Sequence, residues 1–216
     1  MEQPTKRTWA EISLPALSHN YHAIRSVLPD DCRFLGVVKA DAYGHGALRV
    51  AELLQREGAD YLAVSCLDEA LELRKGGITM PILILGHTPV EYTAVLLENG
   101  LTQTATCLAK AEEYSEEAGR LGRTLKLHIK LDTGMSRLGY LCADSQTVAI
   151  VISPVVKIPV THLVYHGAEV SAGLVGVLEY SGKAERVCRS DAEYRPLALV
   201  AGHVMGYGLV YKRHSR

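Results

Sequence analysis

The chain has 216 residues, 48% of them hydrophobic and 22% charged, and its formal net charge at pH 7 is −1. This composition is typical of a globular protein, and so small a net charge gives no overall field that would attract nucleic acid or an anionic membrane. No apolar run is long enough to span a bilayer, and the opening residues do not have the apolar core of a signal peptide.

Strand-like and helix-like segments alternate from about residue 33 to residue 132. Before them, apolar residues at helical spacing predict a helix that contains Leu17, Tyr21 and Ile24, with Ser13 as its cap. The strand candidates are "RFLGVVKA" (33–40), "YLAVSC" (61–66), "PILILG" (81–86), "LTQTAT" (101–106) and "LKLHIKLD" (125–132). Three of them are continuously apolar, which is typical of strands covered on both faces.

The segment 101–106 is the weakest strand candidate, because its threonines indicate strand propensity and not burial. Helices are predicted between the strands. One begins at Leu67, one has Pro89 in its first turn, and one carries an apolar stripe from Leu108 to Leu121.

Successive strand–helix units predict a parallel sheet with right-handed crossovers. Five such units fit either an open doubly wound sheet or the first part of a (β/α)₈ barrel. A complete barrel typically needs about 250 residues. We therefore expect an α/β fold whose N-terminal part is TIM-barrel-like and incomplete, followed by an irregular C-terminal tail.

The character of the sequence changes after Cys142. Pro154 and Pro159 interrupt a β-branched stretch, and no clean strand–helix alternation follows Ala168. Acidic residues outnumber basic ones before residue 142, and basic ones outnumber acidic ones after it. We therefore divide the chain into a βα portion, residues 1–142, and an unassigned tail, residues 143–216.

The cysteines are odd in number, widely spaced and without a CxxC pair; they are Cys32, Cys66, Cys107, Cys142 and Cys188. They predict neither a disulfide framework nor a zinc site, and they indicate a reducing, cytoplasmic setting.

Lys39 ends the first strand of the alternating region, within "LGVVKADAYGHG" (35–46). In open α/β sheets and barrels alike, the carboxyl ends of the strands face the active site. Partial desolvation there favours the uncharged amine that Schiff-base chemistry needs. Gly44 and Gly46 allow the backbone to approach a ligand closely, and the hydroxyl of Tyr43 suits a phosphate oxygen. Without further context, however, a lysine at the end of a strand is usually solvated.

The string "VVKADAYGHG" resembles the pyridoxal-phosphate signature of alanine racemases, without a gap and with the lysine, the tyrosine and both glycines in place. The segment "HIKLDTGMSRLG" (128–139) is similar to the "KxDTGMxRxG" segment of that family, and "RTWAEISLPALSHNY" is similar to its start. The resemblance covers roughly residues 7–142.

By position, the resemblance implies that Lys39 binds pyridoxal 5′-phosphate covalently and acts as the base on the Cα proton of D-alanine. It implies that Tyr43 binds the cofactor phosphate, and that Arg137 holds the phenolate side of the cofactor and the substrate carboxylate. Lys130 matches a position that can be carbamylated and then orients this arginine. Independently of the resemblance, a planar guanidinium suits a carboxylate. Asp132 is expected to shape the turn and not to do chemistry.

Racemisation needs two acid–base groups on opposite faces of the substrate. In the family the second is a tyrosine of a C-terminal domain, contributed by the partner subunit of a homodimer, and we assign no tyrosine of this tail to that role. "VTHL" (160–163) weakly resembles a sixth-strand segment, which makes His162 a candidate near the cofactor ring, with His166 as a rival. The tail is either a non-homologous end, from a frameshift or truncation, or a diverged completion of the fold. The abrupt loss of the strand–helix alternation favours the first interpretation.

These features predict a pyridoxal-phosphate-dependent isomerase that interconverts L-alanine and D-alanine for cell-wall precursors, with weak or no activity from this short chain. The expected substrate is a small amino acid, and neither nucleic acid nor a membrane is an expected partner. The alternatives are a non-catalytic pyridoxal-phosphate-binding barrel and a related barrel decarboxylase. No metal is expected.

Overall fold

The computed structural model describes residues 8–29, 32–132, 136–141, 163–167, 174–180, 194–200 and 209–213. For the four strands after residue 162 it describes the backbone alone. The helices are α1 (Leu14–Arg25), α2 (Lys39–Gly44), α3 (Ala47–Glu57), α4 (Leu67–Lys75), the 3₁₀ helix η1 (Val90–Tyr92), α5 (Thr93–Glu98) and α6 (Leu108–Arg120). The strands are β1 (Thr8–Ile12), β2 (Arg33–Val37), β3 (Tyr61–Val64), β4 (Ile82–Ile84), β5 (Leu101–Ala105), β6 (Lys126–Ile129), β7 (Leu131–Asp132), β8 (Tyr140–Leu141), β9 (Leu163–Gly167), β10 (Leu174–Tyr180), β11 (Tyr194–Val200) and β12 (Leu209–Arg213).

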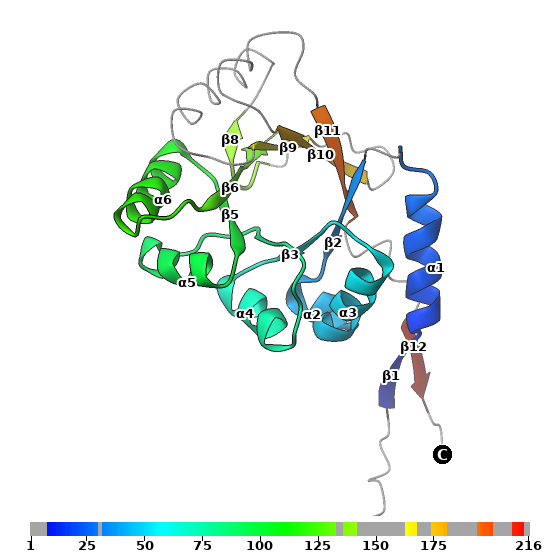
Figure 1. Cartoon of the computed structure of the whole chain (residues 1–216). Coiled ribbons are helices and arrows are strands. Elements are labelled where there is room, and N and C mark those ends of the chain that lie inside the picture. The colour runs from blue at the N-terminus through cyan, green and yellow to red at the C-terminus, as the bar shows by residue number, and fades with distance from the viewer. Residues whose placement is uncertain are drawn as a thin grey trace, which may run out of the picture.

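Eight strands form one curved sheet in the order β6-β5-β4-β3-β2-β11-β10-β9. Strands β2 to β6 are parallel and pair with their neighbours in sequence, and β11 pairs parallel to β2. Strand β10 is antiparallel to both β9 and β11. The two ends of the sheet, β6 and β9, lie close together, so that the sheet curls into a barrel with α3 to α6 around its outside (Figure 1). Strands β1 and β12 form a separate antiparallel pair.

The side chains of β2 to β6 alternate between two buried layers. Phe34 and Val38 of the first strand region join the large core that also contains residues of the surrounding helices. Leu35 and Val37 join a smaller cluster with Tyr61, Ala63 and Leu83, which contains strand residues only. Because successive side chains of a strand point to opposite faces, the first layer is the outer, helix-covered one and the second is the interior of the barrel.

The expected strand–helix alternation is confirmed, and all five strand candidates form strands. Ser13 caps α1 as predicted, because its hydroxyl accepts a hydrogen bond from the backbone N–H of Ala16 at 3.3 Å. Pro89 immediately precedes η1.

The expectation for residues 101–106 was wrong in one respect, since every residue of β5 is buried. Gln103 satisfies its side-chain N–H groups inside the protein, by donating to the carbonyls of Gly86 at 2.7 Å and Thr104 at 2.9 Å. Pairing of these N–H groups reduces the cost of burying this polar side chain.

The expected α/β, TIM-barrel-like fold class is confirmed by this arrangement. Past residue 142, the described elements are strands, and no helix lies among the residues that the structure describes there.

Candidate functional site

Lys39 and Lys130 lie at the carboxyl ends of two strands of the same parallel sheet. Lys39 follows β2 and Lys130 follows β6. The alternation that places Leu35 and Val37 inside the barrel continues to Lys39, two residues further on. Lys130 lies two residues after His128, whose ring packs against the interior residue Tyr61 with centroids 5.8 Å apart. The two lysines are thus brought to one end of the barrel, as the motif positions predicted.

The turn that begins at Lys39 is left-handed. Four consecutive residues, Ala40 to Tyr43, have φ between 49° and 55° and ψ between 37° and 52°. Each L-residue in this conformation costs roughly 1–2 kcal/mol relative to a right-handed turn, so the four together cost on the order of 4–8 kcal/mol. Strain of this size persists only where surrounding contacts impose it, and such strain concentrates at functional sites.

Part of the turn is held by its own residues and by the start of α3. The carboxylate of Asp41 accepts a hydrogen bond from the backbone N–H of Ala47, at 2.7 Å. The carbonyl of Asp41 accepts another from Gly46, at 3.0 Å. Gly46 has φ +88°, a conformation that glycine adopts without steric cost. The buried ring of His45 hydrogen-bonds through Nδ1 to the carbonyl of Ala42, at 2.9 Å.

Glu69, in the first turn of α4, holds the beginning of the left-handed turn. Its Oε1 accepts a hydrogen bond from the backbone N–H of Ala40 at 2.8 Å. Its Oε2 accepts two from Ser65, from the backbone N–H and from the hydroxyl, each at 2.7 Å. Burial alone would raise the pKa of Glu69, but the hydrogen bonds donated by Ser65, Ala40 and the backbone of Cys66 outweigh it and lower that pKa. Glu69 therefore binds its donors as a carboxylate.

Arg137 is held in a second loop at the same end of the barrel. The buried side chain of Asp132 accepts hydrogen bonds from the backbone N–H groups of Ser136, at 2.9 Å, and Arg137, at 2.8 Å. Gly139, with φ +114°, lets the chain return so closely to Lys130 that a Cβ there would lie 2.6 Å from the Lys130 carbonyl oxygen. The side chain of Arg137 is exposed. Asp132 thus shapes the turn, as expected from the sequence.

Three cationic side chains converge at this end of the sheet. Burial lowers the pKa of Lys130, and the positive charges of Arg137 and Lys39 lower it further, against the opposing effect of Asp132. The Nζ of Lys39 lies 6.0 Å from the ring centroid of Tyr43, whose side chain is 45% exposed. A cluster of like charges is unfavourable until an anion joins it. The donor set, an amine, a phenol and a guanidinium, therefore suits anionic oxygens such as those of a phosphate or a carboxylate.

The other predicted residue, His162, lies outside the described residues. Its rival His166 lies on β9, where it pairs with Val177 in the antiparallel register. Sequence reasoning missed Glu69 and Ser65. The available signal was a helix start in which Glu69 follows the N-cap residue Cys66 by three positions, since a glutamate at that position commonly reaches back to the N-cap backbone.

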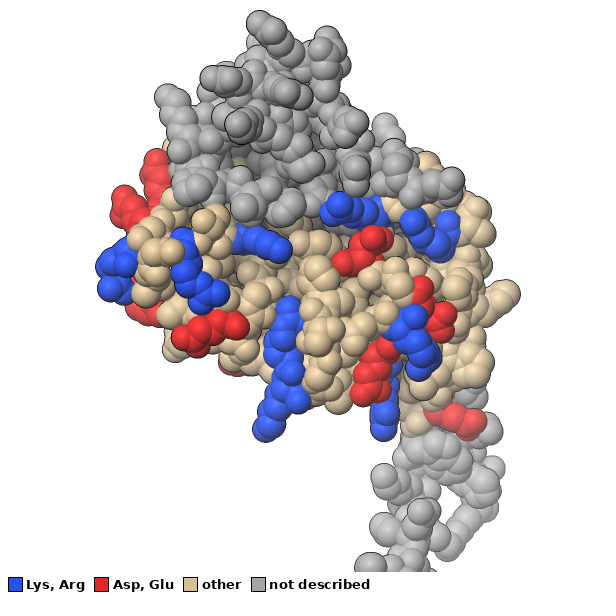
Figure 2. Space-filling model, viewed as in Figure 1, with Lys and Arg blue, Asp and Glu red and all other residues tan. Residues whose placement is uncertain are grey.

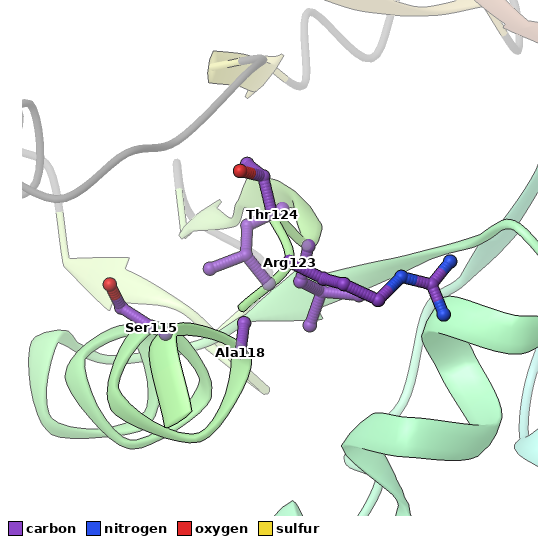
Figure 3. Close-up of a pocket in the computed structure, with 7 residues that line it drawn as sticks. Ser115, Ala118, Arg123 and Thr124 are labelled. Atoms are coloured by element: carbon purple, nitrogen blue, oxygen red, sulfur yellow. The ribbon is translucent and has the colours of Figure 1, made fainter. Parts of the chain in front are cut away.

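A small cavity of about 40 Å³ lies near the amino end of β6, opposite the end that Lys130 follows (Figure 3). Ser115 and Ala118 of α6 line it together with Thr124. Arg123 extends away from α6 and donates to the carbonyl of Leu97 at 2.8 Å. The cavity adjoins the amino end of β6, whereas Lys130 follows the carboxyl end, so the cavity is not part of the site.

The described surface carries mixed charge. In the described part of the face shown in Figure 2, Lys and Arg side chains are interspersed with Asp and Glu. Among the helices of the described ranges, none combines the length and the apolar character that crossing a membrane requires.

Comparison with known proteins places this geometry in a family. The family model described as "Alanine racemase, N-terminal domain" matches residues 12–183, a range that runs past the boundary predicted near residue 142. The chain is 48% identical over 137 residues to "Alanine racemase 2" of Caldanaerobacter subterraneus subsp. tengcongensis, and this match covers 63% of the chain and 35% of that relative. The chain thus spans about a third of the length of the curated relatives it matches.

Two solved structures show how widely the fold is shared. The alanine racemase of Clostridium difficile 630 superposes with a TM-score of 0.68 at 41% identity, over 77% of this chain and 44% of that one. A histidine racemase from Leuconostoc mesenteroides subsp. sake superposes with a TM-score of 0.63 at 28% identity, over 77% of this chain and 45% of that one.

Proposed function

The chain belongs to the alanine racemase N-terminal domain family, and on that basis we propose that it binds pyridoxal 5′-phosphate at Lys39 and acts on the Cα proton of alanine. The observation that carries the proposal is the convergence of Lys39, Lys130 and Arg137 beside the strained turn that ends in Tyr43. Lys39 is the amine that holds the cofactor covalently. When bound, the cofactor acts as an electron sink for the negative charge that forms at Cα.

Each neighbouring residue has a separate part in this proposal. Tyr43 donates its hydroxyl to the cofactor phosphate, and its exposed side chain is free to do so. Arg137 binds the phenolate side of the cofactor and the substrate carboxylate, which a guanidinium contacts with two parallel hydrogen bonds. Lys130 orients Arg137. Its lowered pKa increases the fraction of uncharged amine, the form that carbamylation requires.

Lys39 is also the group that moves the proton. Once the amino group of D-alanine has replaced Lys39 on the cofactor, the freed Nζ would take the Cα proton on one face and return a proton on the same face. Inversion needs a second acid–base group on the opposite face. We assign this second role to no residue of the chain. We therefore expect exchange of the Cα hydrogen of D-alanine with solvent, and weak or no racemisation, from the 216 residues alone.

Alanine is the proposed substrate because the signature segments and the relatives with the higher identities are those of alanine racemases. The histidine racemase among the structural neighbours means that the fold by itself does not select alanine. In the family the opposite-face residue comes from a partner subunit, so a homodimer is part of the proposal.

The test is to incubate the purified chain with pyridoxal 5′-phosphate, follow the visible absorbance of the bound cofactor, reduce with borohydride and locate the label by mass spectrometry. We expect a label on Lys39 and none in a Lys39→Ala variant. Absence of a label on Lys39 would overturn cofactor binding. In a separate sample in deuterated water, the unreduced chain with the cofactor should make D-alanine lose its Cα hydrogen signal. A labelled chain that exchanges no alanine hydrogen would instead indicate a non-catalytic cofactor carrier, and carbon dioxide release from lysine, ornithine or arginine would indicate a decarboxylase.

A further inference from the structure

Glu69 is placed between the cofactor-bearing turn and the neighbouring strand. It belongs to α4, and it joins the N–H of Ala40, immediately after Lys39, to Ser65, immediately after β3. The three hydrogen bonds are 2.7–2.8 Å long, as expected of bonds to an ionised acceptor. Asp41 fixes the far end of the turn to α3. Glu69 is the side chain that fixes the near end, next to the lysine.

Both carboxylate oxygens of Glu69 face donors. The N–H groups of Ala40 and Ser65 belong to the backbone, so neither can reverse its role, and only the hydroxyl of Ser65 can rotate. An amide in place of the carboxylate would direct its NH₂ group at one of the two N–H groups, because it has a single acceptor oxygen. The position therefore requires a carboxylate and not merely a polar side chain of the same size.

The geometry points to Glu69 as a positioning residue that holds the left-handed turn in the conformation in which Lys39 and Tyr43 face the same bound cofactor. The inference rests on the proposed function, because Lys39 and Tyr43 are the residues assigned to the cofactor. The turn is strained along four consecutive residues, so without this anchor the chain would leave the left-handed region at Ala40 first. Lys39 would then lose its fixed position relative to Tyr43.

The experiment compares the 216-residue chain with its variants Glu69→Gln, Ser65→Ala and Asp68→Asn. Asp68 is the matched control, because it lies exposed in the same first turn of α4 and its replacement removes the same charge. Hydrogen exchange of the peptide that covers residues 38–46 is measured first, in the cofactor-free chain. Affinity for pyridoxal 5′-phosphate is then titrated by visible absorbance and corrected for the folded fraction from circular dichroism.

Glu69→Gln should exchange the amides of residues 40–43 faster and should bind the cofactor roughly 10–100-fold more weakly, the effect typical of lost partners that orient a metal ligand. Ser65→Ala keeps both backbone donors and should have a smaller effect, and Asp68→Asn should match the wild type. Unchanged exchange in Glu69→Gln would overturn the inference. A loss of stability with unchanged affinity per folded molecule would also overturn it, since that result means a structural role only. If the wild type binds no cofactor at Lys39, the proposed function fails, whereas the exchange measurement still decides whether Glu69 holds the turn.

Discussion

Replacing Ala40 with glycine should stabilise this protein or leave its stability unchanged, although the same replacement in an ordinary helix destabilises it. Ala40 is exposed and has φ 49°. Glycine removes roughly 1–2 kcal/mol of left-handed strain. The greater conformational freedom of glycine in the unfolded chain reduces this gain by about 0.5–1 kcal/mol. The net change in the free energy of unfolding is therefore an increase of about 0–1.5 kcal/mol.

Ala23→Gly is the matched control. Ala23 is also exposed but lies in the right-handed helix α1, so glycine there should lower the free energy of unfolding by about 0.5–1 kcal/mol. Urea denaturation followed by circular dichroism measures both changes. For a chain of this size each kcal/mol moves the melting temperature by about 2–4 °C. If Ala40→Gly destabilises as much as Ala23→Gly, the turn is not left-handed and the reasoning about strain fails.

The same replacement should weaken the proposed cofactor site. Glycine visits left- and right-handed conformations about equally, so the position of Lys39 relative to Tyr43 becomes less well defined. We expect Ala40→Gly to combine unchanged or higher stability with lower affinity for pyridoxal 5′-phosphate, a trade-off often found at strained sites. Absorbance titration measures the affinity. A variant that is more stable and binds equally well would show that the strain has no part in binding.

Three further predictions concern single side chains. Asp132→Asn should lower the free energy of unfolding in urea by about 1–3 kcal/mol, because one of the two backbone N–H groups of its loop loses its acceptor; an unchanged midpoint would contradict this. The pKa of Glu69 lies below its ordinary value of 4.5. The stability that its carboxylate adds to the folded protein is therefore fully present above pH 4.5 and is lost as the pH falls through the folded-state pKa. The stability difference between the wild type and Glu69→Gln should therefore shrink in acid, and a difference that is constant with pH would refute it. Arg74 is partly buried and donates hydrogen bonds to the carbonyls of residues 78, 80, 99 and 100. Arg74→Met should therefore lower the free energy of unfolding, measured by thermal unfolding, by about 2–3 kcal/mol. An unchanged free energy would mean that solvent replaces these bonds.

The sequence predicted the βα portion of this fold because its signals there are local. Continuous apolar runs such as 81–86 have few alternatives to a strand covered on both faces, and Ser13 is a strong helix cap. The burial of β5 could not be predicted in the same way. Burial of Gln103 depends on the carbonyls of Gly86 and Thr104, which accept hydrogen bonds from its side-chain N–H groups, and Gly86 lies in a different part of the chain.

The same distinction, between local signals and contacts across the chain, applies to the site residues. Lys39, Tyr43, Lys130 and Arg137 could be predicted as site residues because they lie in contiguous motifs. That each occupies its expected place at the carboxyl end of the sheet follows from the parallel order of the strands, whereas the role of each stays a prediction. Glu69 was missed because its importance depends on a contact across 29 residues of sequence, between the first turn of α4 and the N–H of Ala40.

The two anchoring carboxylates explain why strain and charge coexist at this end of the barrel. Glu69 and Asp132 each use both oxygens to accept backbone N–H groups, one beside Lys39 and the other at Arg137 itself. These hydrogen bonds come from the backbone, immediately after Lys39 in one turn and at Arg137 in the other loop, so each carboxylate fixes the chain segment that carries a cation. Removal of either carboxylate should therefore displace the neighbouring cation, and ligand affinity should fall even though the substitution removes a negative charge from a cationic site.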